Sequence, residues 1–164
     1  MNHIIRIHLE HKTDVIRDIK IPSNKSLKEL HYAIINALAI KNNEMASFYI
    51  TNDKLELLQE IPLFKIDEKD NSMLDMSEIT ISSIFPDLNS QLIYIYDFLK
   101  MWRFLISYEK ETKDNTKSIE VTNSIGYMPE EAPEIVFSEK SNVFDDISTN
   151  SIEEEFNQIN EAEY

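Results

Sequence analysis

The sequence predicts a small α+β domain over residues 4 to about 122, followed by an acidic tail. Three observations predict this class. Residues 4–10 and 15–21 alternate apolar and polar side chains with the period of two that is typical of strands. A capped amphipathic pattern follows over residues 26–40, and residues 92–98 are apolar on both faces of an extended chain. This order, β-β-α-β-(β)-β with an additional hairpin strand pair, is that of a β-grasp (ubiquitin-like) fold.

The first two strands should form an antiparallel hairpin. Ile5, Ile7 and Leu9 fall on one face of the first strand, and its polar side chains fall on the other. The link to the second strand is the polar segment 11–14, and so short a link favours an antiparallel pair. Pro22 then ends the hairpin.

The helix is predicted from its start signal and its apolar stripe. Ser26 and Glu29 have the spacing of a capping box, in which each side chain binds the backbone amide of the other residue. The stripe that should pack on the sheet consists of Leu27, Leu30, Ile34 and Leu38. The polar run after Ile40 should end the helix.

The middle of the chain predicts one clear strand, residues 47–51, and residues 54–58 have a pattern that could pair back onto it. Residues 59–78 are the least regular part of the domain, with an exposed acidic loop at 67–71. A short helical turn at 82–85 stops before a proline.

Three further strands complete the predicted domain. Residues 92–98 should be a central strand that is covered on both sides. Residues 102–108 alternate again and should pair with it after a short link. Residues 118–122 should return as a final strand.

The carboxyl-terminal region differs from the rest in charge. Residues 130–164 carry eleven acids and one base, Lys140, in a chain whose net formal charge is −14. We therefore assign residues 1–129 to the domain and 130–164 to an acidic tail, partly disordered or loosely docked, with a short helix at 151–162. Two interpretations stay open: the tail binds a partner, for instance as a mimic of DNA's charge, or it solvates the domain and partly docks on it.

Composition excludes several kinds of chemistry. The chain has no cysteine, which excludes thiolate metal sites, and its one glycine, Gly126, is too few for a phosphate-binding loop. His3 and His11 are eight residues apart along an extended segment, about 26 Å, so they cannot share a metal ion. His31 should be partly buried and bonded to a backbone carbonyl. We therefore expect no metal and no cofactor. Because no apolar run is long enough to span a membrane, we also expect a cytoplasmic protein.

The turn after the central strand holds the candidate interaction residues, which are Tyr96, Asp97, Lys100, Trp102 and Arg103. Asp97 interrupts an apolar strand, where an unpaired carboxylate is costly, so it should lie at the strand end or pair with Lys100 or Arg103. The simplest interpretation is a carboxylate that fixes the turn, since a general acid or base would need a second group and a pocket. Trp102 and the aromatic residues near it could stack on bases, although aromatics on paired strands more often pack on each other.

Three segments of the chain resemble the plasmid pRiA4b ORF-3-like family: residues 15–22, residues 27–31, and residues 94–98 with Trp102 after them. The similarity runs from about Ile4 to Phe137. Members of the family are also described as passenger or resolvase-like proteins of insertion elements. Many have glycine, aspartate and histidine where this chain has Leu99, Lys100 and Phe104. The resemblance implies a shared fold and an association with mobile elements, but no established activity.

These observations predict a non-catalytic protein-interaction module whose partner is an unidentified protein. The alternative, which the family descriptions suggest, is a DNA-transaction accessory protein or a cryptic nucleic-acid enzyme. The three arginines, Arg6, Arg17 and Arg103, are scattered, whereas recombinases cluster arginines around the scissile phosphate. An acidic tail also repels DNA, and the body, which would have to bind it, has no basic run, so direct nucleic-acid binding is not expected. The sequence does not determine the oligomeric state.

Overall fold

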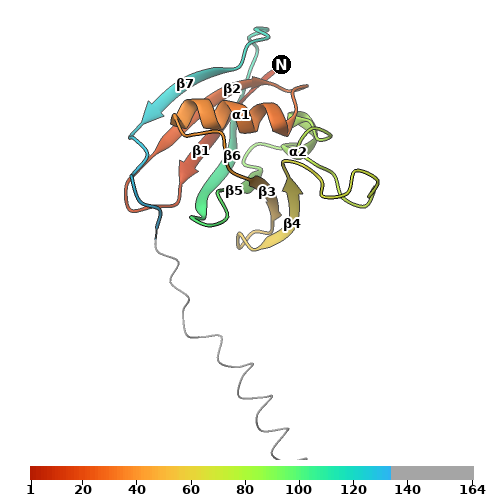
Figure 1. The fold of residues 1–164 in the computed structure, drawn as a ribbon. Helices are drawn as coiled ribbons and strands as arrows, with labels where there is room; N and C mark the ends of the chain where they lie inside the picture. Colours follow the sequence, from red (N-terminus) through yellow and green to blue (C-terminus); the bar gives the residue numbers. More distant parts are fainter. Residues whose placement is uncertain (134–164) are drawn as a thin grey trace, which may run out of the picture. The chain divides into compact units, whose positions relative to one another are not determined.

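Within residues 1–133, seven antiparallel strands form a single sheet in the order β4-β3-β5-β6-β1-β2-β7 (Figure 1). This computed structural model describes residues 1–133. Its elements are β1 (Asn2–Leu9), β2 (Ile16–Pro22), α1 (Leu27–Leu38), β3 (Ala46–Thr51), β4 (Leu57–Pro62), α2 (Ile81–Ile84), β5 (Gln91–Tyr96), β6 (Trp102–Thr112) and β7 (Glu120–Ile125). In Figure 1, α1 crosses the sheet near β2, and β7 runs along the outer side of β2.

The predicted α+β class with a β-grasp order is wrong. The described residues form mostly antiparallel sheet, and their two helices have only 12 and 4 residues. A period of two identifies strands but says nothing about which strands pair or in which direction. Here β1 lies between β2 and β6, antiparallel to both, and β7 extends the sheet beyond β2. These long-range pairings set the fold class.

The helix forms where the capping box predicts it. Ser26 Oγ accepts a hydrogen bond from the Glu29 amide at 3.2 Å, and Glu29 Oε2 accepts one from the Ser26 amide at 2.9 Å. Two otherwise unpaired amides of the first turn are thereby satisfied. The helix ends at Ala39, whose left-handed φ of 53° closes the last turn. The capping-box prediction is confirmed.

The hydrophobic core lies between α1 and the face of the sheet that α1 covers. Phe48, Tyr94 and Phe104 occupy opposed positions on β3, β5 and β6, and all three are fully buried. The ring centroid of Tyr94 lies 4.8 Å from that of Phe48 and 5.9 Å from that of Phe104. Burial of each such side chain stabilises the fold by about 1.5 to 3 kcal/mol. These three opposed aromatic side chains confirm that β5 is an interior strand paired with β6.

Two strands begin later than their sequence patterns predict. Asn52 Oδ1 accepts hydrogen bonds from the amides of Lys54 and Glu56, and this local turn delays β4 to residue 57. The strand predicted at 54–58 therefore forms at Leu57–Pro62 instead. The irregular region begins after it rather than at residue 59. Similarly, β7 spans Glu120–Ile125 where residues 118–122 were expected.

His31 sits inside the core rather than at its margin. Its ring is fully buried, and Nδ1 lies 2.7 Å from the hydroxyl oxygen of Tyr94. The prediction of a bond to a backbone carbonyl is wrong, because Tyr94 on β5 supplies a hydroxyl inside the core. Burial disfavours the charged ring and lowers the pKa of His31 to about 4, and the nearby charge of Lys28 acts in the same direction.

Neither helix in residues 1–133 is long and apolar enough to cross a membrane. The helix predicted at 151–162 and most of the acidic tail lie outside the described residues.

Candidate functional site

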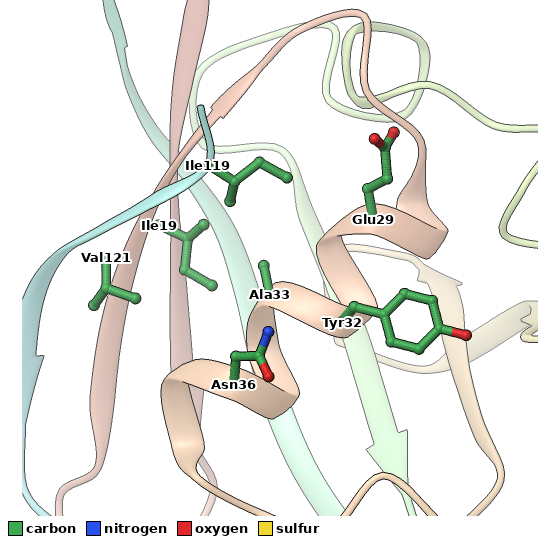
Figure 2. A pocket seen from close by; sticks show the side chains of 7 residues that line it. All are labelled: Ile19, Glu29, Tyr32, Ala33, Asn36, Ile119 and Val121. Atoms are coloured by element: carbon green, nitrogen blue, oxygen red, sulfur yellow. The ribbon is translucent and has the colours of Figure 1, made fainter. Parts of the chain in front are cut away.

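An apolar groove separates α1 from the strand at the sheet edge, and we call it the α1–β7 groove (Figure 2). It has a volume of about 310 Å³. Its lining residues are Ile19, Glu29, Tyr32, Ala33, Asn36, Ile119 and Val121. Figure 2 shows the three aliphatic residues on the sheet side and the other four on α1.

The helix side of the groove follows from the period of α1. Glu29, Ala33 and Asn36 are spaced by four and three residues, so they share one face of the helix. That face lies beside the stripe that packs on the core, and Ala33 on it packs against the edge of the core. Because Ala33 has a short side chain, the helix leaves space beside the sheet where a larger residue would fill it.

The sheet side of the groove follows from strand register. Ile19 on β2 lies opposite Val121 on β7, and both line the groove. Ile19 is fully buried and forms the floor, whereas Val121 is 47% exposed and Tyr32 on the helix is 37% exposed. The groove therefore keeps apolar surface in contact with water within a rigid frame of helix and sheet.

One end of β7 is held by Arg17, which is buried although it is charged. Its guanidinium donates hydrogen bonds of 2.8 to 2.9 Å to the backbone carbonyls of Ile16, Ala37, Ile125 and Gly126. These acceptors belong to the C-terminal part of α1, to β2 and to the end of β7. Arg17 thus fixes the distance between the helix and the edge strand at this end of the groove.

The other end of β7 is held by Lys20. Its Nζ lies 2.7 Å from Asp114 Oδ2 and 2.9 Å from Glu120 Oε2. The hydrogen bond to Asp114, followed by the one to Glu120, raises the pKa of Lys20, which stays charged. The pair of carboxylates anchors the loop that leads into β7.

Asp18 holds the middle of β7 at a bulge. The register shifts between Asp18 and Ile19, and there the Thr122 hydroxyl donates to the Asp18 carbonyl at 3.3 Å. The Asp18 carboxylate accepts from Arg6 at 2.8 and 2.9 Å and from the Asn123 amide at 3.2 Å. The Arg6 hydrogen bond lowers the pKa of Asp18 against the opposing effect of its burial.

Glu29 is the only charged residue that lines the groove. Burial raises its pKa, but hydrogen bonds from the Ser26 backbone and from Lys25 outweigh burial, so the net shift is downward. Glu29 is therefore ionised at neutral pH. The groove combines an apolar lining with an ion pair at its rim, because Lys25 Nζ lies 2.9 Å from Glu29 Oε1.

Four of the five residues that the sequence singles out line a second hollow of about 610 Å³, and these are Tyr96, Asp97, Lys100 and Trp102. Arg103 does not join them, because alternation along β6 directs it to the other face of the sheet. There its Nε lies 2.9 Å from Glu10 Oε2. The proposed contact role of these residues stays a prediction.

Asp97 acts within its turn. Its Oδ1 accepts hydrogen bonds from the amides of Leu99 at 3.1 Å and Lys100 at 3.2 Å, and its φ of 60° is left-handed. Asp97 directly follows the end of β5, which is the first of the two predicted alternatives. The described residues contain no ion pair of Asp97 with Lys100 or Arg103, and Lys100 binds through its backbone amide. Trp102 is 7% exposed and lies opposite Tyr96 in the strand register, so most of its side chain packs in the core, and the rest lines the second hollow.

Sequence reasoning missed the α1–β7 groove. Ile119 and Val121 lie in a segment predicted only as a short final strand, and its neighbour β2 is about 100 residues away in the sequence. The usable signal was local: a small Ala33 between the polar residues Glu29 and Asn36 on one face of the helix, and apolar residues at alternate positions 119 and 121.

Comparisons with known proteins found a solved structure of similar fold and a matching family model. The crystal structure of a protein of unknown function from Methanosarcina mazei Go1 matches with a TM-score of 0.60 and 20% sequence identity. The match covers 75% of this chain and 68% of that one, and at this identity it shows the fold alone. No curated protein matches the chain significantly. The model of the family described as plasmid pRiA4b ORF-3-like protein matches residues 2–160, so the chain belongs to that family.

Proposed function

We propose that this protein is a non-catalytic interaction module, that it serves a mobile element, and that the α1–β7 groove is its contact surface for another protein. The observation that carries the proposal is the groove itself, in which Val121 and Tyr32 leave apolar surface exposed beside a buried floor. Contact surfaces of this kind have an apolar centre, and aromatic side chains such as Tyr32 are common anchors in them.

The rigidity of the frame supports a role in binding. Arg17, Asp18 and Lys20 on one strand fix β7 at both ends and at its middle. A groove whose walls are already in place loses little conformational entropy when a partner enters it, so more of the binding energy is retained. None of these three side chains points into the groove or lines it.

The arginines favour a protein partner over DNA. Arg6 is paired with Asp18, Arg17 with four carbonyls and Arg103 with Glu10, so all three are engaged within the fold. Affinity for DNA comes chiefly from free cations that neutralise phosphates, and the chain carries a net charge of −14. A gel-shift series at low salt is expected to show no complex with duplex DNA.

The test compares one groove variant with a matched control. Val121→Lys places a charge at the half-exposed rim of the groove, and Leu57→Lys places the same charge on β4, at the opposite edge of the sheet, where Leu57 is 41% exposed. The full chain and both variants are used as baits in host-cell extract, and retained proteins are quantified by mass spectrometry. We expect a partner that wild type and Leu57→Lys retain and Val121→Lys loses. Equal retention by all three baits would exclude the groove as the contact surface.

A further inference from the structure

β7 is an edge strand beside the groove. Within residues 1–133 its only neighbour in the sheet is β2, so the backbone amides and carbonyls on its outer side are open to a new strand. The exposed apolar side chains of Val121 and Ile125 lie along the same strand. Edge strands of this kind are the usual place where an extended peptide joins a sheet.

The dimensions of the edge and of the helix agree. The six residues of β7 extend over about 20 Å at about 3.3 Å per residue. The twelve residues of α1 extend over about 18 Å at 1.5 Å per residue. A strand of about six residues that pairs with β7 would therefore match α1 in length, and every second side chain of it would point to the side of the sheet on which α1 lies.

Charge identifies the kind of segment that fits. Glu120 begins β7 and shares Lys20 with Asp114, so these three side chains together keep one net negative charge, whereas Glu29 on the helix side of the groove is paired with Lys25. The chain as a whole carries a net charge of −14. A positive segment is attracted to this surface, and an acidic segment is repelled. Two copies of this chain, each with a net charge of −14, repel each other, which disfavours pairing of β7 with β7.

We infer that the α1–β7 groove binds an extended, basic segment of another protein, which adds as a strand to the outer edge of β7 with alternate apolar side chains in the groove. This inference rests on the proposed function and makes it specific. Main-chain hydrogen bonds to β7 provide pairing, and apolar side chains at every second position fill the space beside Ala33 and Val121. The basic side chains between them point to the opposite face of the sheet, as Glu120 does next to Val121 on β7.

The test uses a defined probe, a heptapeptide in which valine and lysine alternate, titrated against the full-length chain by fluorescence anisotropy. In an extended peptide, the N–H and C=O of one residue point to the same side, and those of the next residue point to the opposite side. Two further peptides carry N-methyl groups on two internal valines or on two internal lysines. Methylation of one set is expected to weaken binding by at least about tenfold, and methylation of the other set to leave it nearly unchanged.

Each outcome decides the inference. A threonine–lysine peptide of the same charge should not bind, and Val121→Lys should weaken binding of the valine–lysine peptide while Leu57→Lys does not. Equal effects of the two methylation patterns would overturn strand addition, although continued sensitivity to Val121→Lys would keep the groove as a contact surface. No binding at about 1 mM peptide would overturn the assignment of a basic apolar segment. Sedimentation that shows a dimer displaced by the peptide would assign the β7 edge to a second copy instead.

Discussion

Replacement of Arg17 by methionine removes the group that joins the end of β7 to α1 and keeps a side chain of similar length. Four hydrogen bonds to backbone carbonyls are lost. At about 1 kcal/mol net for each bond, the free energy of unfolding should fall by about 3 to 4 kcal/mol. For a domain of this size, that corresponds to a fall in melting temperature of roughly 10 to 20 °C.

The assay for Arg17→Met is urea denaturation followed by circular dichroism, with Arg103→Met as the matched control. Arg103 forms one ion pair with Glu10 at a partly exposed site, so its replacement should cost at most about 1 kcal/mol. Amide hydrogen exchange adds a local measurement, since the amides of β7 should lose more protection than those of β5. Equal losses of stability in Arg17→Met and Arg103→Met would refute the assigned role of Arg17.

Three other substitutions test separate parts of the fold. Gly126→Ala should lower the free energy of unfolding by at least about 2 kcal/mol in urea denaturation, because φ is 73° there and an added Cβ would overlap the backbone oxygen of Asp14. Ser124→Ala, on the strand that ends just before Gly126, should be nearly neutral. His31 has its pKa lowered from 6.5 to about 4 in the folded state, so the unfolded chain binds the proton first and stability falls as the pH drops from about 6.5 toward 4, by up to about 3 kcal/mol. His31→Gln should remove this part of the pH dependence, and an unchanged slope between pH 6.5 and 4 would show that another group causes it. Asp97→Ala should cost about 1 to 2 kcal/mol, because two hydrogen bonds are lost at a left-handed residue. Asp97→Asn keeps the acceptor and tolerates that φ, so a cost equal to that of alanine would contradict the turn role.

Local signals in the sequence predicted the elements well. The alternation in residues 4–10 and 15–21, the capping box of Ser26 and Glu29, and the apolar run of β5 depend on neighbouring residues only, and each formed its expected element. Pairing between distant segments was not predictable in the same way. The positions of β6 and β7 on either side of the first hairpin join residues that are about 100 positions apart, so the fold class was missed.

The side chains that shape the site were hidden for a related reason. Arg17 and Lys20 occupy polar positions of a half-buried strand, where an exposed charge is the ordinary expectation. Their burial makes sense only when Gly126 and Asp114 supply partners from the far end of the domain. A charge pattern read along one strand gives no sign of such partners. Asp97, whose partners are two and three residues away, was interpreted correctly from the sequence.

The way β7 is held bears directly on how its free edge can be used. A strand that joins an edge must find amides and carbonyls already aligned, since aligning them on binding would cost about 1 to 2 kcal/mol for each backbone residue that becomes ordered. In the folded protein these groups are already aligned, so the cost belongs to folding rather than to binding. β7 is held by Arg17 at one end, by Asp18 at the bulge and by Lys20 at the other end. Arg17→Met should therefore weaken binding of the valine–lysine peptide even at temperatures where the variant remains folded, although Arg17 does not line the groove. If the folded variant bound the peptide with wild-type affinity, the alignment of β7 would not depend on Arg17, and the coupling between the two roles would be wrong.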